Sequence, residues 1–271
     1  MRGSLGEKIG EGVMADVHAW APGQVVKLFK AGISRRFARH EARMTRAAFA
    51  AGASAPEVFD EVVVEGRFGI VLTRLDGSTL LHLLRTGAIT SEQVGSILAT
   101  LYISVHKTPP PPVVISLRDK FEYGYRHSGL LPKHIATGIL TLIKRLPPAD
   151  RLCYNDLHPG NVIMTADGPR IIDWLGMVRA DAALDLGRCH LHLSELIYSP
   201  EGIDPERPRA LNATVQSEYA RLAGISVVTL TAAMERYLPI LRAFALADRA
   251  TNPARRERLM QSVEATLRLE D

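Results

Sequence analysis

The chain has 271 residues, of which 46% are hydrophobic and 23% are charged. This balance supplies ample apolar material for a core and room for two lobes, and it excludes extensive disorder. The two cysteines, Cys153 and Cys189, do not form a Cys-x-x-Cys pair, so neither a disulfide framework nor a structural zinc site is expected.

The formal net charge of +4 and the pI near 9.2 raise the question of nucleic-acid binding. Acidic residues interleave with the basic ones, and the densest basic cluster, Arg255-Arg-Glu-Arg258, follows an expected helix start at Pro253. We therefore predict a solvated helix face and no nucleic-acid partner. The first residues lack the apolar core of a signal peptide, and no apolar run is long enough to cross a membrane. We expect a cytoplasmic protein without a membrane partner, and nothing in the sequence marks its oligomeric state.

The N-terminal segment from Lys8 to Phe29 is expected to form hairpin-like strands. Gly10 and Gly12 stand in a Gly-x-Gly pattern at a hairpin tip, a weak signal that an ordinary hairpin explains equally well, and the third small position is Ala15. Lys27 lies within the apolar run Val25-Val-Lys-Leu-Phe29. A lysine in such a strand needs a sheet edge, a route to solvent for its head group, or a charged partner.

Residues 34–51 lack proline and glycine and are expected to form a helix. Glu41 lies about one turn from both Phe37 and Met44, which are expected to face the sheet, so it points inward from the apolar edge. This phase predicts a Lys27–Glu41 ion pair. The alternative is that Glu41 is solvated beside Arg43.

Further along the chain, residues 62–64 are expected to pair with residues 68–72 across Glu65-Gly66, and the chain then becomes mainly helical. The segment Thr90-Ser-Glu-Gln93 has the pattern of a capping box at the start of a helix that the prolines from Pro109 to Pro112 end. Later helices are expected at residues 182–198, 207–222, 230–247 and 253–269.

The segment Tyr154-Asn-Asp-Leu-His-Pro-Gly-Asn161 places Asp156 and Asn161 in the Asp-x-x-x-x-Asn spacing of a phosphoryl-transfer loop. An apolar strand at residues 162–164, a turn at Ala166-Asp-Gly168 and a returning strand would bring Asp173 beside Asn161. Asn161 and Asp173 offer the hard oxygen ligands that Mg²⁺ prefers, and Asp156 could accept the proton of an attacking hydroxyl. The alternative is three unrelated polar residues in turns and at strand ends.

These motifs, with Ile171-Ile-Asp-Trp174, Asp185-Leu-Gly-Arg188 and Ile70-Val-Leu-Thr-Arg-Leu-Asp-Gly77, resemble those of the aminoglycoside phosphotransferase and choline kinase group of protein-kinase-like enzymes. The resemblance covers most of the chain. It implies an α+β, bilobal fold, with a small β-rich lobe at residues 1–74 that contains one helix, a hinge at about 72–77, and a larger, mainly helical lobe at residues 75–271.

The resemblance also implies a site that uses ATP and Mg²⁺. In that site, Asp156 is the catalytic base, Asn161 and Asp173 are the metal ligands, and Asp185 is a structural brace near the catalytic loop. The nucleotide-binding residues it implies are Gly10, Gly12, Lys27 with its partner Glu41, and the hinge residues Leu72, Arg74 and Leu75.

One departure concerns Tyr154, which stands where the family usually has histidine, although an aromatic ring with a polar tip can fill the same space. Two functions remain open. The first is an ATP-dependent kinase that phosphorylates a hydroxyl of a small molecule. The second is a nucleotide-binding pseudokinase or regulatory module. The segment from Ser226 onward contains six acidic residues and seven arginines, so it has no excess of negative charge for binding a polycation. We therefore expect an acceptor less cationic than an aminoglycoside.

Overall fold

The structure is a computed structural model that describes residues 5–128, 131–196, 206–246 and 253–270. Its contacts divide the chain into two units. Unit 1 comprises Met1–Leu83 and Pro159–Met177, and unit 2 comprises Leu84–His158 and Val178–Asp271. The predicted α+β class is confirmed, because a sheet dominates unit 1 and helices dominate unit 2. The lobe boundary at residue 74 stays a prediction.

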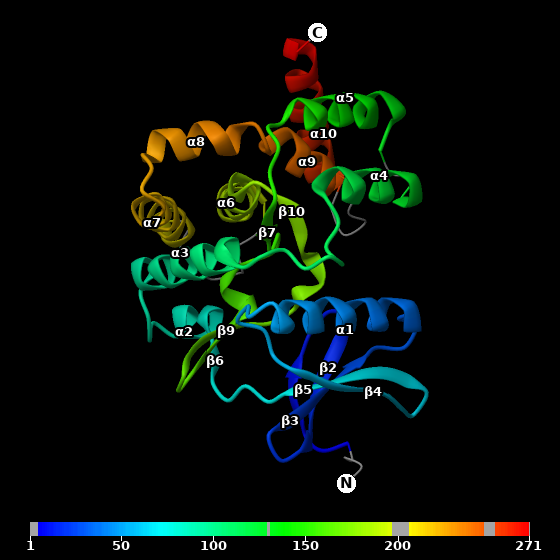
Figure 1. Cartoon of the computed structure of the whole chain (residues 1–271). Helices are drawn as coiled ribbons and strands as arrows, with labels where there is room; N and C mark the ends of the chain where they lie inside the picture. Colours follow the sequence, from blue (N-terminus) through cyan, green and yellow to red (C-terminus); the bar gives the residue numbers. More distant parts are fainter. Residues whose placement is uncertain (1–4, 129–130, 197–205, 247–252, 271) are drawn as a thin grey trace. The chain divides into compact units, whose positions relative to one another are not determined.

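Unit 1 is built on a five-stranded antiparallel sheet in the order β1-β2-β3-β5-β4 (Figure 1). Its strands are β1 (Lys8–Glu11), β2 (Ala15–Ala21), β3 (Gln24–Phe29), β4 (Val58–Val64) and β5 (Arg67–Thr73). The predicted hairpin across Glu65 and Gly66 joins β4 to β5, and both residues have positive φ, as a two-residue hairpin turn requires.

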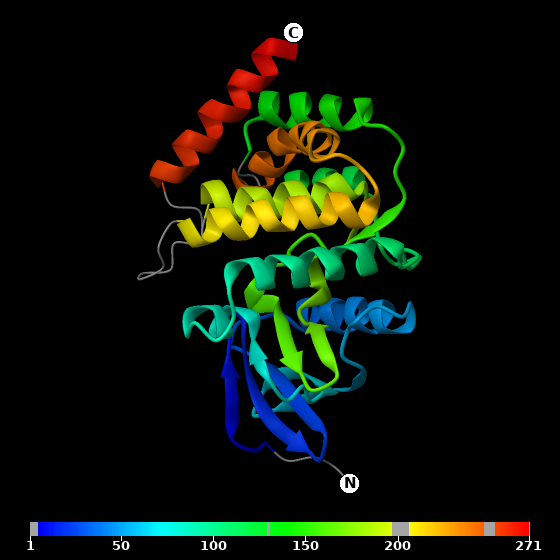
Figure 2. The ribbon, with the colours of Figure 1, turned by 90° about the vertical axis from the view of Figure 1, so that its left-hand side faces the viewer.

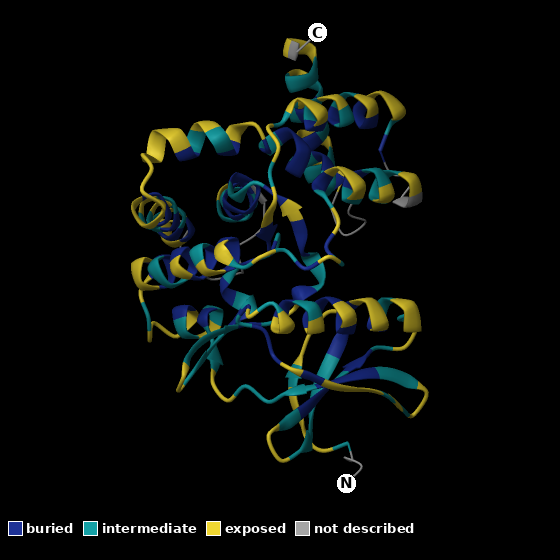
Figure 3. Cartoon of the chain, viewed as in Figure 1, coloured by how far each residue is buried: buried dark blue, intermediate teal, exposed yellow. Residues whose placement is uncertain are grey.

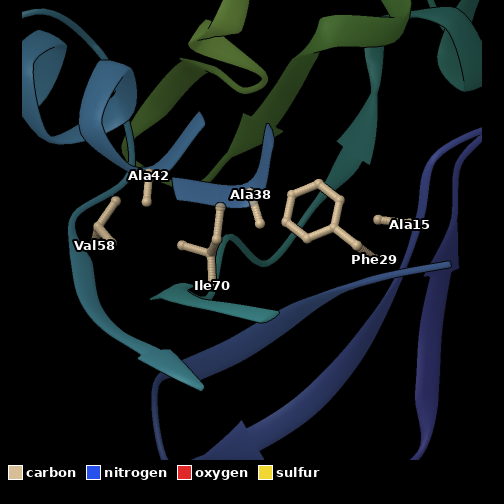
Figure 4. Packing of buried hydrophobic residues seen from close by; sticks show 6 residues of the cluster. All are labelled: Ala15, Phe29, Ala38, Ala42, Val58 and Ile70. Carbon is tan, nitrogen blue, oxygen red and sulfur yellow. The ribbon is translucent and has the colours of Figure 1, made fainter. Parts of the chain in front are cut away.

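Helix α1 (Arg35–Ala50) packs on this sheet (Figure 4). Ser34 caps the start of the helix, because its hydroxyl accepts a hydrogen bond from the N–H of Phe37 at 3.2 Å. Small residues of α1 lie against larger side chains of the strands, so the helix approaches the sheet closely. The resulting core contains Ala15, Phe29, Ala38, Ala42, Val58 and Ile70.

A second, three-stranded sheet in unit 1 has the order β6-β8-β9. It comprises β6 (Ser78–Thr79), β8 (Val162–Thr165) and β9 (Gly168–Ile171), and short 3-10 turns flank the β8–β9 hairpin at Pro159–Asn161 and Trp174–Gly176. Gly77 enters this sheet so closely that a Cβ there would lie 1.9 Å from the carbonyl oxygen of Met164. Only glycine fits this position.

Unit 2 consists of helices around the short antiparallel pair β7 (Arg151–Cys153) and β10 (Val178–Ala180) (Figure 1). The helices are α3 (Ser91–Lys107), α4 (Leu117–Ser128), α5 (Lys133–Arg145), α6 (Ala182–Leu191), α7 (Glu206–Ala223), α8 (Val227–Glu235), α9 (Leu238–Leu246) and α10 (Pro253–Glu270). Figure 2 shows two of these helices, α3 and α7, lying side by side. One π turn, His192–Leu196, follows α6, and a short helix, α2 (Leu80–Arg85), crosses from unit 1 into unit 2. Figure 3 shows that α6 is mostly buried, whereas α8 and α10 each present an exposed side.

Most of the predicted helices are confirmed, including the capping box formed by Thr90 and Gln93 at the start of α3. The single helix predicted at residues 230–247 is wrong, because α8 ends at Glu235 and α9 begins at Leu238. Pro239 explains the break, since it lacks an N–H and its ring clashes with the carbonyl four residues earlier. The helix predicted at 182–198 is α6 and its π turn as far as Leu196; residues 197 and 198 lie outside the described residues.

Helices α4 and α5 were not predicted. In the described part of the chain, no helix is long and apolar enough to span a membrane.

Candidate active site

Lys27 lies on β3, between β2 and β5 in the middle of the large sheet. The strand register places Gly10, Val17, Lys27 and Ile70 in one row across four strands. Residues that are directly opposite on neighbouring strands project from the same face. Gly10 has no side chain, so the row carries no side chain at its β1 end.

Glu41 is the partner of this lysine, as the helical phase of α1 predicts. The Lys27 ammonium donates a hydrogen bond to the Glu41 carboxylate, and Glu41 is buried. The reading of Glu41 as a solvated helix residue is therefore wrong. Burial raises the pKa of the Glu41 carboxyl, the positive charge of Lys27 opposes that rise, and the negative charge of Asp173 adds to it. Lys27 thus favours the ionised form of Glu41.

Asp173 follows the β8–β9 hairpin and lies close to the same lysine, with 3.7 Å between Lys27 Nζ and Asp173 Oδ2. Its backbone adopts a left-handed conformation, with φ of 63°. Such a conformation is strained for a residue with a side chain, and residues held this way concentrate at functional sites. The Asp173 side chain is 44% exposed, so its carboxylate is accessible.

Asn161 lies at the other strand end of the same hairpin. Val162 pairs with Ile171, and the Ile172 N–H donates to the Asn161 carbonyl at 3.0 Å, so the backbones before β8 and after β9 are adjacent. The predicted approach of residues 161 and 173 is confirmed at the level of the backbone. An amide oxygen and an accessible carboxylate fit Mg²⁺, which takes one or two protein oxygens and completes its shell with phosphate oxygens and water.

The glycine-containing tip joins β1 to β2 through Gly12, Val13 and Met14. The Gly12 N–H donates to the Ala15 carbonyl at 2.8 Å, which closes a tight turn, and the Val13 side chain is exposed. The tip therefore presents backbone and an apolar side chain to solvent. The roles of Gly10 and Gly12 in nucleotide binding stay predictions.

The predicted hinge continues from the end of β5. The Leu72 side chain packs against the core between the sheet and α1. Arg74 pairs with Asp76 at 2.7 Å, and its N–H donates to the Gly23 carbonyl at 2.9 Å. Arg74 and Leu75 also line a cavity of about 390 Å³, together with residues of the β8–β9 turn. Nothing in these contacts tests a role in adenine binding.

Asp156 lies in unit 2, on a loop whose backbone is held on both sides of it. The Asp185 carboxylate accepts hydrogen bonds from the N–H groups of Tyr154, at 2.8 Å, and Asn155, at 2.6 Å. The buried Tyr102 hydroxyl donates to the Leu157 carbonyl at 3.0 Å. The Asp156 side chain remains 42% exposed. These contacts fix the loop and confirm Asp185 as its brace.

Asp185 is itself held by buried, hydrogen-bonded side chains that the sequence did not predict. His106 on α3 contacts Asp185 Oδ2 through Nε2 at 3.1 Å and the Tyr219 hydroxyl through Nδ1 at 2.9 Å. Potential metal-binding atoms of His106, Cys153 and Asp185 lie within 4.8 Å of one another. Both imidazole nitrogens are already engaged, however, and burial raises the pKa of the Cys153 thiol, which keeps it protonated. We therefore interpret the cluster as a hydrogen-bonded support.

Tyr154, the departure from the family pattern, is fully buried. Its ring lies in the core, and its backbone N–H donates to the Asp185 carboxylate at 2.8 Å. The substitution of tyrosine for the usual histidine therefore leaves the anchoring of the catalytic loop intact.

Cationic side chains surround Asp156 in unit 2. Arg188 Nη2 on α6 lies 3.6 Å from Asp156 Oδ1. The pKa of Lys120 on α4 is lowered to about 8, mainly by burial and also by the positive charge of Arg188, whereas Asp156 acts in the opposite direction. Burial also lowers the pKa of His192 to about 3, and Arg188, His158 and Arg255 contribute to that shift. His192 is therefore neutral at pH 7.

Sequence reasoning assigned no role to Arg188 or Lys120. The signal for Arg188 was its position three residues after Asp185, which places both side chains on one side of α6. No local pattern pointed to Lys120, because its approach to α6 depends on how α4 packs.

A profile of the phosphotransferase enzyme family, abbreviated APH, matches residues 15–225. The chain belongs to this family. Among solved structures, this phosphotransferase is similar to a thermostable mutant of the aminoglycoside phosphotransferase APH(4)-Ia in its apo form, with a TM-score of 0.61 and 17% identity over 99% of this chain and 95% of the other. A search of the curated proteins finds no match.

The phosphotransferase is also similar to ADP-bound aminoglycoside phosphotransferase APH(2'')-Ib, with a TM-score of 0.57 and 17% identity over 97% of this chain and 93% of the other. A choline/ethanolamine kinase family protein from Mesorhizobium loti gives a TM-score of 0.52 and 17% identity over 97% and 87% of the two chains. At this level of identity the similarity establishes the kinase-like fold.

Proposed function

We propose that this phosphotransferase moves the γ-phosphoryl group of ATP to a hydroxyl of a small molecule in the cytoplasm. The observation that carries the proposal is the buried Lys27–Glu41 ion pair with Asp173 at 3.7 Å from the lysine, all within unit 1. A buried ion pair contributes little net stability, because desolvation offsets the attraction between the charges. Its position beside an accessible carboxylate favours a role in binding phosphate and metal.

Within this proposal, Lys27 contacts the phosphates of the nucleotide, and Glu41 holds the lysine in place. Asn161 and Asp173 hold Mg²⁺, which when bound neutralises charge on the phosphate oxygens. The backbone at Gly10 and Gly12 covers the phosphates, and the segment with Leu72, Arg74 and Leu75 receives the adenine. The ADP-bound relative with the same fold supports the binding of a nucleotide.

Asp156 accepts the proton of the acceptor hydroxyl as that oxygen attacks the γ-phosphorus and the bond to the leaving ADP oxygen breaks. Its accessible carboxylate on a firmly anchored loop supports this role, because phosphoryl transfer depends mainly on positioning and charge stabilisation. A module that only binds nucleotide has no use for Asp156. This difference separates the enzyme from the pseudokinase alternative.

The test is a panel of hydroxyl compounds incubated with ATP and Mg²⁺, with phosphorylated product detected by mass. We expect at least one compound to gain a phosphoryl group. Asp156→Asn should lower turnover by about 10²–10⁴-fold and leave nucleotide affinity within twofold, since proton transfer by a positioned side chain contributes about that factor. Tight nucleotide binding with equal turnover by the wild type and Asp156→Asn would contradict the proposal and favour the pseudokinase.

A further inference from the structure

We propose that the acceptor carries an anionic group, a carboxylate or a phosphate, which Arg188 and Lys120 bind beside Asp156. This inference rests on the proposed function and specifies the class of its second substrate. It differs from a resemblance-based expectation, because the names of the similar proteins point to cationic acceptors such as aminoglycosides and choline.

The first argument is the hydrogen-bonding state of Arg188. Its side chain is 25% exposed, and its buried Nε has no hydrogen-bond partner among the residues that the structure describes. The closest carboxylate oxygen, on Asp156, lies 3.6 Å away, beyond ordinary hydrogen-bond length. A guanidinium has five N–H donors, and leaving them unsatisfied in a partly buried place is costly. A planar anion satisfies several of them at once.

The second argument is the balance of charge around Asp156. Arg188 and Lys120 contribute positive charge from two helices, α6 and α4. Asp185, the other nearby carboxylate, is buried and is already engaged by two backbone N–H groups and His106. Asp156 is the accessible carboxylate that lies beside Arg188.

The pKa of Lys120 is lowered mainly by burial, and repulsion from Arg188 adds to this shift. Arg188 disfavours the charged form of Lys120, although Asp156 favours it. An additional anion between the two side chains would relieve this repulsion, whereas an ammonium group would increase it. Neutral His192 can contribute a hydrogen bond there without adding charge.

The acceptor is favoured over the nucleotide as the source of the anion. Lys27 and Asp173, which we assign to the phosphates and the metal, lie in unit 1, whereas Arg188 and Lys120 lie in unit 2 with Asp156. The acceptor is the substrate whose hydroxyl must reach Asp156. If Arg188 binds the anionic group of the acceptor, the acceptor hydroxyl is held near the Asp156 carboxylate. Binding of the charged group then also orients the hydroxyl for reaction.

The experiment uses three sugars of the same ring size that differ in charge: glucuronate, glucose and glucosamine. Each is tested with ATP and Mg²⁺ at neutral pH, and kcat/KM is measured from ADP release and from product mass. We expect glucuronate to exceed glucose about tenfold or more, with glucosamine lowest. Equal or better use of glucose or glucosamine would overturn the inference while leaving the proposed function intact.

Variants test the assigned side chains. Arg188→Gln and Lys120→Gln should each lower the glucuronate-to-glucose ratio of kcat/KM about tenfold, mainly through KM, and Arg188→Lys should retain part of the preference. The matched control is Arg126→Gln, which removes a cation from the exposed side of α4 and should leave the ratio unchanged. An equal fall in kcat on all three sugars in Arg188→Gln would assign Arg188 to the transferred phosphoryl group and refute its role in acceptor charge.

If none of the sugars is phosphorylated, saturation-transfer NMR reads binding without turnover. A glucuronate signal that is lost in Arg188→Gln, without matching signals from glucose and glucosamine, supports the inference. No glucuronate signal, or equal signals from the three sugars, overturns it. Failure of the proposed function gives a different result, namely no transfer to any compound of the wider panel.

Discussion

Asp185→Asn tests the brace beneath the catalytic loop. In the wild type one carboxylate accepts the Tyr154 and Asn155 N–H groups and contacts His106, all in the core. The asparagine amide has one acceptor oxygen, so its NH₂ group would oppose an N–H donor. Hydrogen bonds to charged groups contribute about 1.5–3 kcal/mol each, and breaking a buried charged network costs about 3–5 kcal/mol. We expect the free energy of unfolding to fall by about 3–5 kcal/mol, from a total of about 5–15 kcal/mol for an ordinary protein.

The assay is urea unfolding followed by circular dichroism, with Asp150→Asn as the matched control. Asp150 is exposed and lies 3.4 Å from Arg179, so its substitution should change stability by less than about 0.5 kcal/mol. Turnover of Asp185→Asn should also fall under conditions where the protein remains folded, because the loop that carries Asp156 is loosened. A destabilisation below about 1 kcal/mol would refute the account of Asp185 as a brace, since no such small cost fits the loss of two charged hydrogen bonds.

Three further predictions concern the charged residues of the site. Lys27→Met should abolish most turnover and leave a buried, unpaired Glu41; the double variant with Glu41→Gln should recover stability but not activity, and a recovery of both would contradict the phosphate role. Asp173→Ala should weaken Mg²⁺-dependent nucleotide binding about tenfold or more in calorimetry while binding without Mg²⁺ stays unchanged, and equal affinities with Mg²⁺ would remove Asp173 from the metal site. Lys120 should lose its positive charge as pH rises through about 8, so KM for an anionic acceptor should rise above that pH in the wild type and stay flat in Lys120→Gln.

The pKa of Lys120 also fixes the sign of its contribution to stability. Its pKa is lowered from the usual 10.5 to about 8 in the folded protein, so the unfolded chain binds more protons between these values. Stability contributed by this group therefore increases as pH rises from about 8 toward 10.5, and it is lowest where the lysine is charged in both states.

Local patterns predicted the parts of the site that lie close together in sequence. The β8–β9 hairpin follows from an apolar run, a turn with glycine and a returning strand, and it positions Asn161 and Asp173. The Lys27–Glu41 pair follows from two kinds of periodicity: the apolar strand that contains Lys27 and the helical spacing that turns Glu41 toward the sheet. In these cases the geometry of one element, or of two adjacent elements, determines the contact.

Sequence patterns did not predict the contacts that depend on how helices far apart in the sequence pack together. His106 on α3 and Tyr219 on α7 support Asp185, and Lys120 on α4 interacts electrostatically with Asp156. Nothing in the local sequence of these residues indicates which helices become neighbours. The break between α8 and α9 was missed for a local reason, because Pro239 was treated as part of a continuous apolar pattern. The brace role of Asp185 came only from the family resemblance.

The catalytic loop is secured through main-chain atoms, which changes what evolution can vary there. Asp185 and Tyr102 grip the N–H groups of residues 154 and 155 and the carbonyl of Leu157, and these atoms are the same whatever the side chains are. The hydrogen bonds to Asp185 and from Tyr102 therefore do not depend on which side chain stands at position 154. A tyrosine in place of the usual histidine leaves these main-chain contacts in place, so the missing histidine is not by itself a sign of an inactive site in this chain.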